Sequence, residues 1–140
     1  MLTGAQEGAV PVTDYVGSRE LRAGSLVRGI RIRPDRWQSH YVRAAATQFD
    51  YAGFTITVLW KLDDRRVIDD LRLVVVGNKR KYERLSELEG RLVGQGADDL
   101  DLSKVCAETG VEFSTKTIGG PDYVRHLFDV ELQRAIETVT

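Results

Sequence analysis

The spacing of apolar residues changes once along the chain, near residue 82, and this change limits the folds that the chain can adopt. Before it, alternate residues are apolar, most clearly in 54–60, and a period of two is typical of a strand with one buried face. After it, apolar residues recur at three and four, as in 85–93 and 124–139, which is the spacing of amphipathic helices. Strands followed by helices, rather than alternating with them, predict an α+β fold.

Three segments predict strands. In the first, 25–33, apolar and charged residues alternate until Pro34, which ends the strand. Its apolar members are Leu26, Val27, Ile30 and Ile32, and its charged members are Arg28, Arg31 and Arg33. The second and third segments, 54–60 and 67–76, lie on either side of a polar turn, so we expect them to pair as an antiparallel hairpin. The stretch 37–51 shows no clear period.

Three later segments predict helices: 82–93, which ends before the C-cap residue Gly94, then 102–109, then 121–139, which begins with a proline. We therefore expect a three-stranded antiparallel sheet packed against a bundle of about three helices. We expect residues 1–17 to be an N-terminal arm or linker and residues 18–140 to be a single α+β domain.

Charge and cysteine content exclude several classes of function. The net charge of −1 gives no general attraction to nucleic acid or to an acidic membrane surface, and no apolar run approaches the length of a membrane-spanning helix. The single cysteine, Cys106, excludes an internal disulfide and cysteine-built metal sites, so we expect no metal. Together these features predict a cytoplasmic protein that binds neither nucleic acid nor membranes.

Several short patterns occur in the order known from one family. They are Val10 to Tyr15, Leu21 to Pro34, Tyr41-Val42-Arg43, Asp50-Tyr51-Ala52, Asp70 to Gly77, Glu89-x-x-Leu92-x-Gly94 and Pro121 to His126. Over residues 10–139 the chain resembles the C-terminal domain of the FAD-binding medium subunit of carbon-monoxide dehydrogenase, xanthine dehydrogenase and related molybdenum hydroxylases. The resemblance implies a three-stranded antiparallel sheet with a three-helix bundle.

The resemblance also implies that FAD is held by glycine-rich loops of a different domain, and this sequence contains no such loops. Gly94-Gln95-Gly96 follows a predicted helix rather than a strand, which is the wrong context for a dinucleotide-binding turn. The family's usual arginine is replaced by Thr47, and Gly77 is followed by Asn78 instead of a second glycine. We expect no cofactor on this chain alone, and FAD only through a partner chain.

Seven residues are candidates for binding or chemistry. The resemblance places Tyr41 and Arg43 beside the flavin, where a ring can stack and a guanidinium can pair with an anion. His40 is a candidate general base and Asp50 a candidate acid or base, against the alternatives of a surface histidine and a turn cap. Trp37, Tyr51 and Arg80 are candidate ligand-binding residues, Arg80 because it lies in the basic run 79–81, which is otherwise a solvated surface.

Two functions fit these residues, and the sequence leaves open whether the chain is itself an enzyme. The first is a stand-alone accessory to a molybdenum hydroxylase-type oxidoreductase that docks on a separate FAD-binding chain. The second is a cofactor-free cyclase or isomerase of specialised metabolism, which uses the former flavin-facing surface as a pocket for a small-molecule ligand. Its lining would be Tyr41, His40, Arg43, Asp50, Tyr51 and Trp37. A homodimer through an unpaired strand edge, such as 25–33, is compatible with both.

Overall fold

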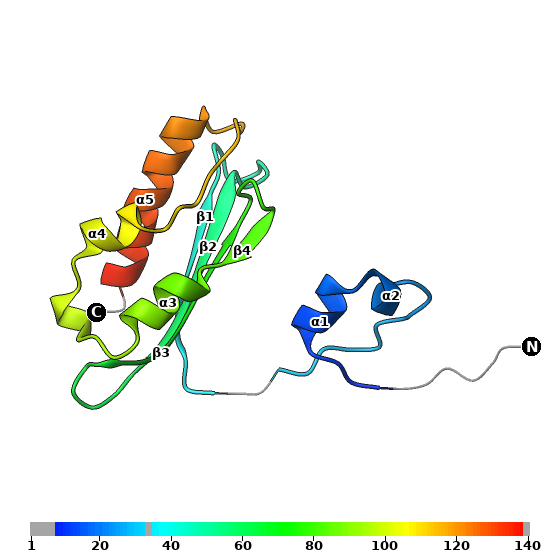
Figure 1. Ribbon diagram of the computed structural model, residues 1–140. Helices are drawn as coiled ribbons and strands as arrows, with labels where there is room; N and C mark the ends of the chain where they lie inside the picture. Colours follow the sequence, from blue (N-terminus) through cyan, green and yellow to red (C-terminus); the bar gives the residue numbers. More distant parts are fainter. Residues whose placement is uncertain (1–7, 33–34, 139–140) are drawn as a thin grey trace, which may run out of the picture. The chain divides into compact units, whose positions relative to one another are not determined.

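The structure, a computed structural model, describes residues 8–32 and 35–138 (Figure 1). Contacts divide the chain into two units, Met1–Pro34 and Asp35–Thr140. The first contains α1 (Val12–Gly17) and α2 (Arg19–Arg22). The second contains β1 (Gln38–Ala44), β2 (Phe54–Leu62), β3 (Ile68–Val76), β4 (Tyr82–Arg84), α3 (Ser86–Leu92), the 3-10 turn η1 (Ala97–Asp99), α4 (Leu102–Ala107) and α5 (Pro121–Glu137). The predicted boundary after residue 17 falls between α1 and α2 and stays a prediction.

The second unit is built on a four-stranded antiparallel sheet in which every strand pairs with its neighbour in sequence. Thr57 of β2 lies opposite Val74 of β3, which confirms the predicted hairpin. The turn between them is held by the Asp63 side chain, which accepts the backbone N–H groups of Arg65 and Val67 at 2.9 Å and 2.8 Å. The sheet therefore follows from local pairings.

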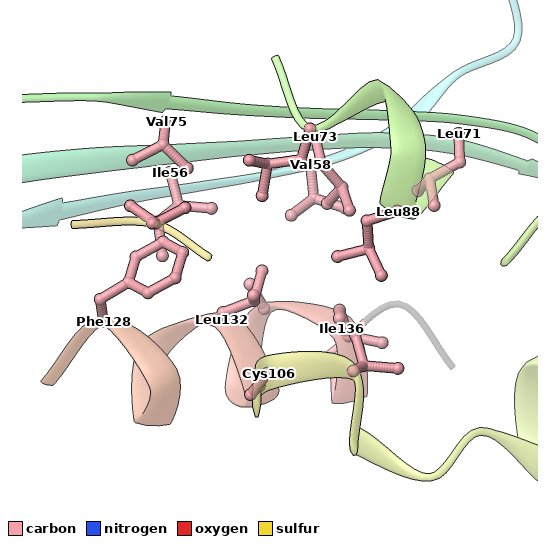
Figure 2. Close-up of a cluster of buried hydrophobic side chains, with 14 of the residues drawn as sticks. Ile56, Val58, Leu71, Leu73, Val75, Leu88, Cys106, Phe128, Leu132 and Ile136 are labelled. Atoms are coloured by element: carbon pink, nitrogen blue, oxygen red, sulfur yellow. The ribbon is translucent and has the colours of Figure 1, made fainter. Parts of the chain in front are cut away.

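The core lies between one face of this sheet and the helices. The alternation of apolar and polar residues along the strands predicts this arrangement, because it places the apolar side chains on one face. Alternate residues of β2 and β3 are buried, while their neighbours on the strands are half-buried or exposed. α5 lies across β1 and β2, α3 lies against β3, and α4 packs on α5. Figure 2 shows side chains of the sheet and of α5 pointing toward each other: Ile56, Val58, Leu73 and Val75 from the sheet, and Phe128, Leu132 and Ile136 from α5.

The strand count is four rather than the predicted three, and the strands are not all the expected ones. The prediction of a strand at 25–33 is wrong for the residues described there, since 25–32 have no regular secondary structure. The reason is that no strand of the sheet pairs with them, and an alternating pattern cannot by itself supply a partner. Residue 33 lies outside the described residues.

The two unexpected strands are the edges of the sheet. β1 lies in the stretch 37–51, whose sequence shows no clear period. The reason is that only the last residue of β1, Ala44, is fully buried on the core face. β4 takes the first three residues of the predicted helix 82–93, so that α3 begins only at Ser86. Edge strands are covered on fewer sides, so their sequences are constrained less by burial.

Two glycines bring the loops at one end of the sheet together. Gly77 has a φ of +95°, and a Cβ atom there would lie 2.6 Å from the backbone oxygen of Gly53. A Cβ atom at Gly53 would in turn lie 2.5 Å from Cδ1 of Ile118. The β1–β2 loop, the β3–β4 turn and the segment before α5 therefore meet at this end. Only glycine fits at residue 77, where the φ is positive and the close atoms are backbone, whereas a side chain at residue 53 would have to displace the end of Ile118.

Glu89 is a buried carboxylate with a structural task. It lies on α3 and accepts the backbone N–H of Leu73 in β3 at 2.8 Å. The half-exposed guanidinium of Arg84 donates two bonds to Oε2 of Glu89, at 2.9 Å from Nε and 2.7 Å from Nη2. The carboxylate therefore joins α3, β3 and β4, which explains the glutamate of the Glu89-x-x-Leu92-x-Gly94 pattern within this fold.

Candidate functional site

One face of the sheet has no helix of the second unit over it, as Figure 1 shows. We call it the open face. The strand registers place one row of its side chains side by side, namely Tyr41, Thr57, Val74 and Arg84. Tyr41 is 61% exposed, and Tyr82 and Val76 at the next row are also exposed. An exposed surface that combines aromatic, aliphatic and arginine side chains has the composition of a protein interface.

Arg43 lies on the same face as Tyr41 and is tied to the β1–β2 loop. Its Nη2 donates a hydrogen bond to the backbone carbonyl of Asp50, so the loop closes back on the strand that precedes it. The carboxylate of Asp50 is not part of this contact. Arg43 is thereby held at one end of the open face, close to the loop in which Tyr51 lies.

The β1–β2 loop carries two aromatic side chains that contact almost nothing. Tyr51 is 96% exposed and Phe49 is 95% exposed. Sequence reasoning chose Tyr51 and missed Phe49, although both flank the same aspartate. Side chains that are this exposed contribute little to the fold, and exposed aromatic residues are enriched at binding surfaces.

His40 does not join Tyr41. It lies on the core face of β1, half-buried and opposite Val58, whereas Tyr41 lies on the open face opposite Thr57. Adjacent residues of a strand point to opposite faces, so the two side chains are separated by the sheet. The structure therefore does not gather His40 and Tyr41 into one pocket, and the catalytic roles of His40, Tyr41 and Asp50 stay predictions.

Trp37 is held by two cations that sequence reasoning did not identify. The Nζ atom of Lys61 lies 4.5 Å from the centroid of its ring, and the guanidinium carbon of Arg72 lies 5.4 Å from it. Lys61 also pairs with Asp35, with 2.6 Å between Nζ and Oδ2. Trp37 therefore fastens the chain before β1 to the open face above β2 and β3, and its ring is already in contact with protein groups.

Arg80 lies beside a hollow near Gly77, at the end of the sheet where the loops meet. The hollow has a volume of about 160 Å³ and is lined by Asn78, Lys79, Arg80, Glu83, Gly110 and Glu112. Arg80 pairs with Glu83 and Lys79 pairs with Glu112, each at 2.7 Å between nitrogen and oxygen. The hydrogen bond from Lys79 holds the pKa of the Glu112 carboxyl below its usual range. These cations are already neutralised, so an anion would have to displace a carboxylate to bind them.

Cys106 is not a nucleophile in this fold. Burial raises the pKa of its thiol from 9.0 to about 11, and the nearby Asp129 carboxylate adds to the rise. At pH 8 we expect the native thiol to react with a disulfide reagent at least about 100-fold more slowly than in the urea-unfolded chain, because only the thiolate attacks. Since the folded pKa is the higher one, ionisation favours unfolding, and stability is lost as the pH rises from 9 toward 11. Rapid labelling of the native protein would contradict this assignment.

The described residues offer neither a metal site nor a membrane span. Among residues 8–32 and 35–138, no group of three or more histidine, cysteine, aspartate or glutamate side chains is arranged to hold a metal ion. No helix in the same ranges is both long enough and apolar enough to cross a bilayer.

Comparison with known proteins identifies relatives by structure alone, since neither a family model nor a curated protein matches the chain. A chain of CO dehydrogenase from Oligotropha carboxidovorans superposes on 77% of this chain with a TM-score of 0.66 and 21% identity. A chain of quinoline 2-oxidoreductase from Pseudomonas putida 86 superposes on 74%, with a TM-score of 0.64 and 16% identity. The chain has the fold of the part of these chains on which it superposes.

A third relative, CO dehydrogenase from Hydrogenophaga pseudoflava lacking the Mo-pyranopterin moiety of its cofactor, has a TM-score of 0.62 at 16% identity over 72% of this chain. The chain spans little more than a third of the length of these relatives, between 35% and 38%. The comparison confirms the predicted likeness to the CO dehydrogenase fold. It concerns the fold and carries no residue roles.

Gly94 and Gly96 make contacts within the second unit that hold the fold together. Gly94 ends α3 with a φ of +87°, and its N–H donates to the backbone oxygen of Ile68 at 2.9 Å. A Cβ atom at Gly96 would meet the carboxylate of Asp99 at 2.7 Å, and a carboxylate there repels a phosphate. Gly94 and Gly96 therefore serve the fold and do not suit the phosphates of FAD.

Proposed function

We propose that the chain is an accessory of a molybdenum hydroxylase-type oxidoreductase and docks through its open face on a separate FAD-binding chain. One observation carries this proposal: no helix of the second unit covers the sheet face that bears the exposed Tyr41 and Tyr82, in a fold that makes up only 35–38% of the relatives' chains. The remainder of such a chain, supplied as another polypeptide, is the partner that we propose for this face.

In this arrangement the chain's own residues shape the surroundings of the flavin. Tyr41 presents a ring that can stack on a flat heterocycle, and Arg43, anchored by the Asp50 carbonyl, supplies a fixed positive charge nearby. FAD, held by the partner, would supply the electron transfer. The described residues contribute binding area, orientation and exclusion of water.

The alternative of a cofactor-free enzyme lacks a comparable observation in its favour. That reaction would need an acid or base beside Tyr41 in a shared pocket, and His40 lies on the opposite side of the sheet. Two hollows lie around Lys79 and Glu112 in the described part of the chain, and none of their lining residues is one of the predicted catalytic three.

Replacing Tyr41 by alanine should weaken binding to the FAD-loaded partner about 10- to 100-fold, because tyrosines at the centre of an interface often contribute 2 kcal/mol or more. The measurement is isothermal titration of the full chain against the flavin-binding chain encoded in the same genome. Tyr123→Ala is the matched control, since Tyr123 is 55% exposed but lies on α5.

Two results would contradict the proposal. Equal losses for Tyr41→Ala and Tyr123→Ala would show that the open face is not the docking surface. Flavin absorption bands that stay with the isolated chain after gel filtration would show that it binds FAD by itself. A colourless chain that gains flavin absorption only in the complex is the expected result.

A further inference from the structure

The loop between β1 and β2, residues 45–53, carries the two most exposed aromatic side chains among the described residues of the second unit. Phe49 is 95% exposed and Tyr51 is 96% exposed, whereas Tyr41 on the open face is 61% exposed. Within the second unit both rings are therefore left to water. Burial of a large aromatic ring is strongly favourable, so rings that a fold leaves in water are typical of surfaces that bind another molecule.

The loop is also longer than the connection between two paired strands requires. Hairpin loops usually have about 2–5 residues. The β2–β3 turn, residues 63–67, is of this kind, but the β1–β2 loop extends from residue 45 to residue 53. The extra length contains both exposed rings, and connections that are longer than the fold requires are common places for binding residues.

Hydrogen bonds within the loop restrict its conformation. The N–H of Gly53 donates to the carbonyl of Ala44 at 2.8 Å and closes the base of the loop. The N–H of Asp50 donates to the carbonyl of Thr47 at 3.3 Å, which forms a turn at the tip. A loop that is ordered before binding loses little conformational entropy on binding, so more of the free energy of burying its rings contributes to affinity.

Arg43 joins the loop to the open face. Its side chain lies on the same face of β1 as that of Tyr41, and its Nη2 donates to the carbonyl of Asp50. Asp50 lies between Phe49 and Tyr51 in the sequence, so the loop borders the open face at the end of β1. A partner that covers the open face around Tyr41 therefore reaches the loop as well.

We propose that the loop 45–53 is a second anchor of the docking surface, and that Phe49 and Tyr51 enter an apolar pocket of the FAD-binding chain. This inference rests on the proposed function, since it names further residues that hold the same partner. Rigid aromatic side chains that fill a pocket of the partner are the usual hot spots of protein interfaces. The loop therefore contributes affinity, while Tyr41 and Arg43 lie closer to the middle of the sheet.

Isothermal titration of the full chain against the FAD-loaded flavin-binding chain of the same genome tests this anchor. Replacing Phe49 and Tyr51 together by alanine should raise the dissociation constant at least about 100-fold, since each ring is expected to contribute at least about tenfold. Gln48→Ala is the matched control, because Gln48 is an exposed residue of the same loop, and it should change the dissociation constant less than about threefold.

The results for the anchor and for docking itself are distinguishable. If Tyr41→Ala weakens the complex and the double loop variant does not, the anchor is wrong and the docking function stands. If the wild-type chain does not bind the partner, the docking function fails and the anchor fails with it. A wild-type chain that self-associates in sedimentation, and becomes monomeric without the two rings, would show that a second copy covers the loop and would overturn the anchor.

Labelling a cysteine at residue 49 reports directly what covers the loop. In the free full chain, Phe49→Cys should react with a maleimide at least about 100-fold faster than the buried Cys106. A saturating excess of the FAD-loaded partner should slow this reaction at least about tenfold. A slow reaction in the free chain would mean that the chain's own residues cover the loop, and equal rates with and without partner would mean that the partner leaves it open. Either result overturns the proposal.

Discussion

Replacing Phe128 by alanine should lower the free energy of unfolding by about 3–5 kcal/mol, the usual cost of removing a large aromatic side chain from a core. Phe128 of α5 is completely buried, and its ring centroid lies 5.8 Å from that of Phe54 and 5.4 Å from that of Phe113. These three rings join the sheet, the segment before α5 and α5 itself. Urea unfolding followed by circular dichroism measures the loss.

Phe49→Ala is the control for this experiment, because it removes the same atoms from the surface. Phe49 is almost fully exposed, so its replacement should change the free energy of unfolding by less than about 0.5 kcal/mol. A comparable loss in both variants would show that Phe128 does not lie in the centre of the core. Since small domains are stable by only about 5–15 kcal/mol, the Phe128 variant is expected to be partly unfolded near 40 °C.

Glu89→Ala should cost about 3 kcal/mol of stability, although the residue removed is charged. The substitution leaves the buried N–H of Leu73 without its acceptor and Arg84 without its partner. Both losses act on the contact between α3 and the sheet. Amide hydrogen exchange should show the change directly, as faster exchange at Leu73 than at residues of β2.

Two further variants separate the two tasks of Glu89. Glu89→Gln keeps an oxygen that can accept from the Leu73 N–H, so we expect less than about half of the alanine loss. Glu87→Ala is the control, because Glu87 lies on the exposed side of the same helix. If the losses at Glu87 and Glu89 are equal, the carboxylate of Glu89 does not hold α3 on the sheet.

The elements that could be predicted from the sequence are those with one fully buried face. Burial of alternate residues in β2 and β3 leaves a clear period of two, and burial of one side of α5 leaves a period near 3.6. The polar turn that begins at Asp63 then predicted that these two strands pair as an antiparallel hairpin. Each of these predictions rests on residues that are near in sequence, and each is confirmed.

The edges of the sheet could not be predicted in this way. β1 is buried on only part of one face, so its sequence shows no clear alternation, and β4 is only three residues long. The segment 25–33 shows the opposite case, because its alternation is clear although residues 25–32 have no partner strand among the residues that the structure describes. An alternation of apolar residues predicts which face of a strand would be buried, but it does not predict which other segment covers that face.

The candidate site shows the same division. The separation of His40 from Tyr41 follows from their being neighbours on a strand, and sequence parity alone predicts it. The contacts of Trp37 with Lys61 and Arg72 join segments far apart in the chain, and so does the bond from Leu73 to Glu89 across 16 residues. The spacing of lysines, arginines and glutamates along a sequence does not show which distant residue each of them contacts in the folded protein.

The order of the elements has a consequence for the synthesis of this protein. The sheet is complete when Arg84 has been made, but α5, which covers much of its core face, begins only at Pro121. Chains are made from the N-terminus at about 5–20 residues per second, so the growing chain carries an uncovered apolar sheet for seconds. Truncated products that end before α5 should therefore be targets for chaperones, and they should aggregate where the full-length chain stays in solution.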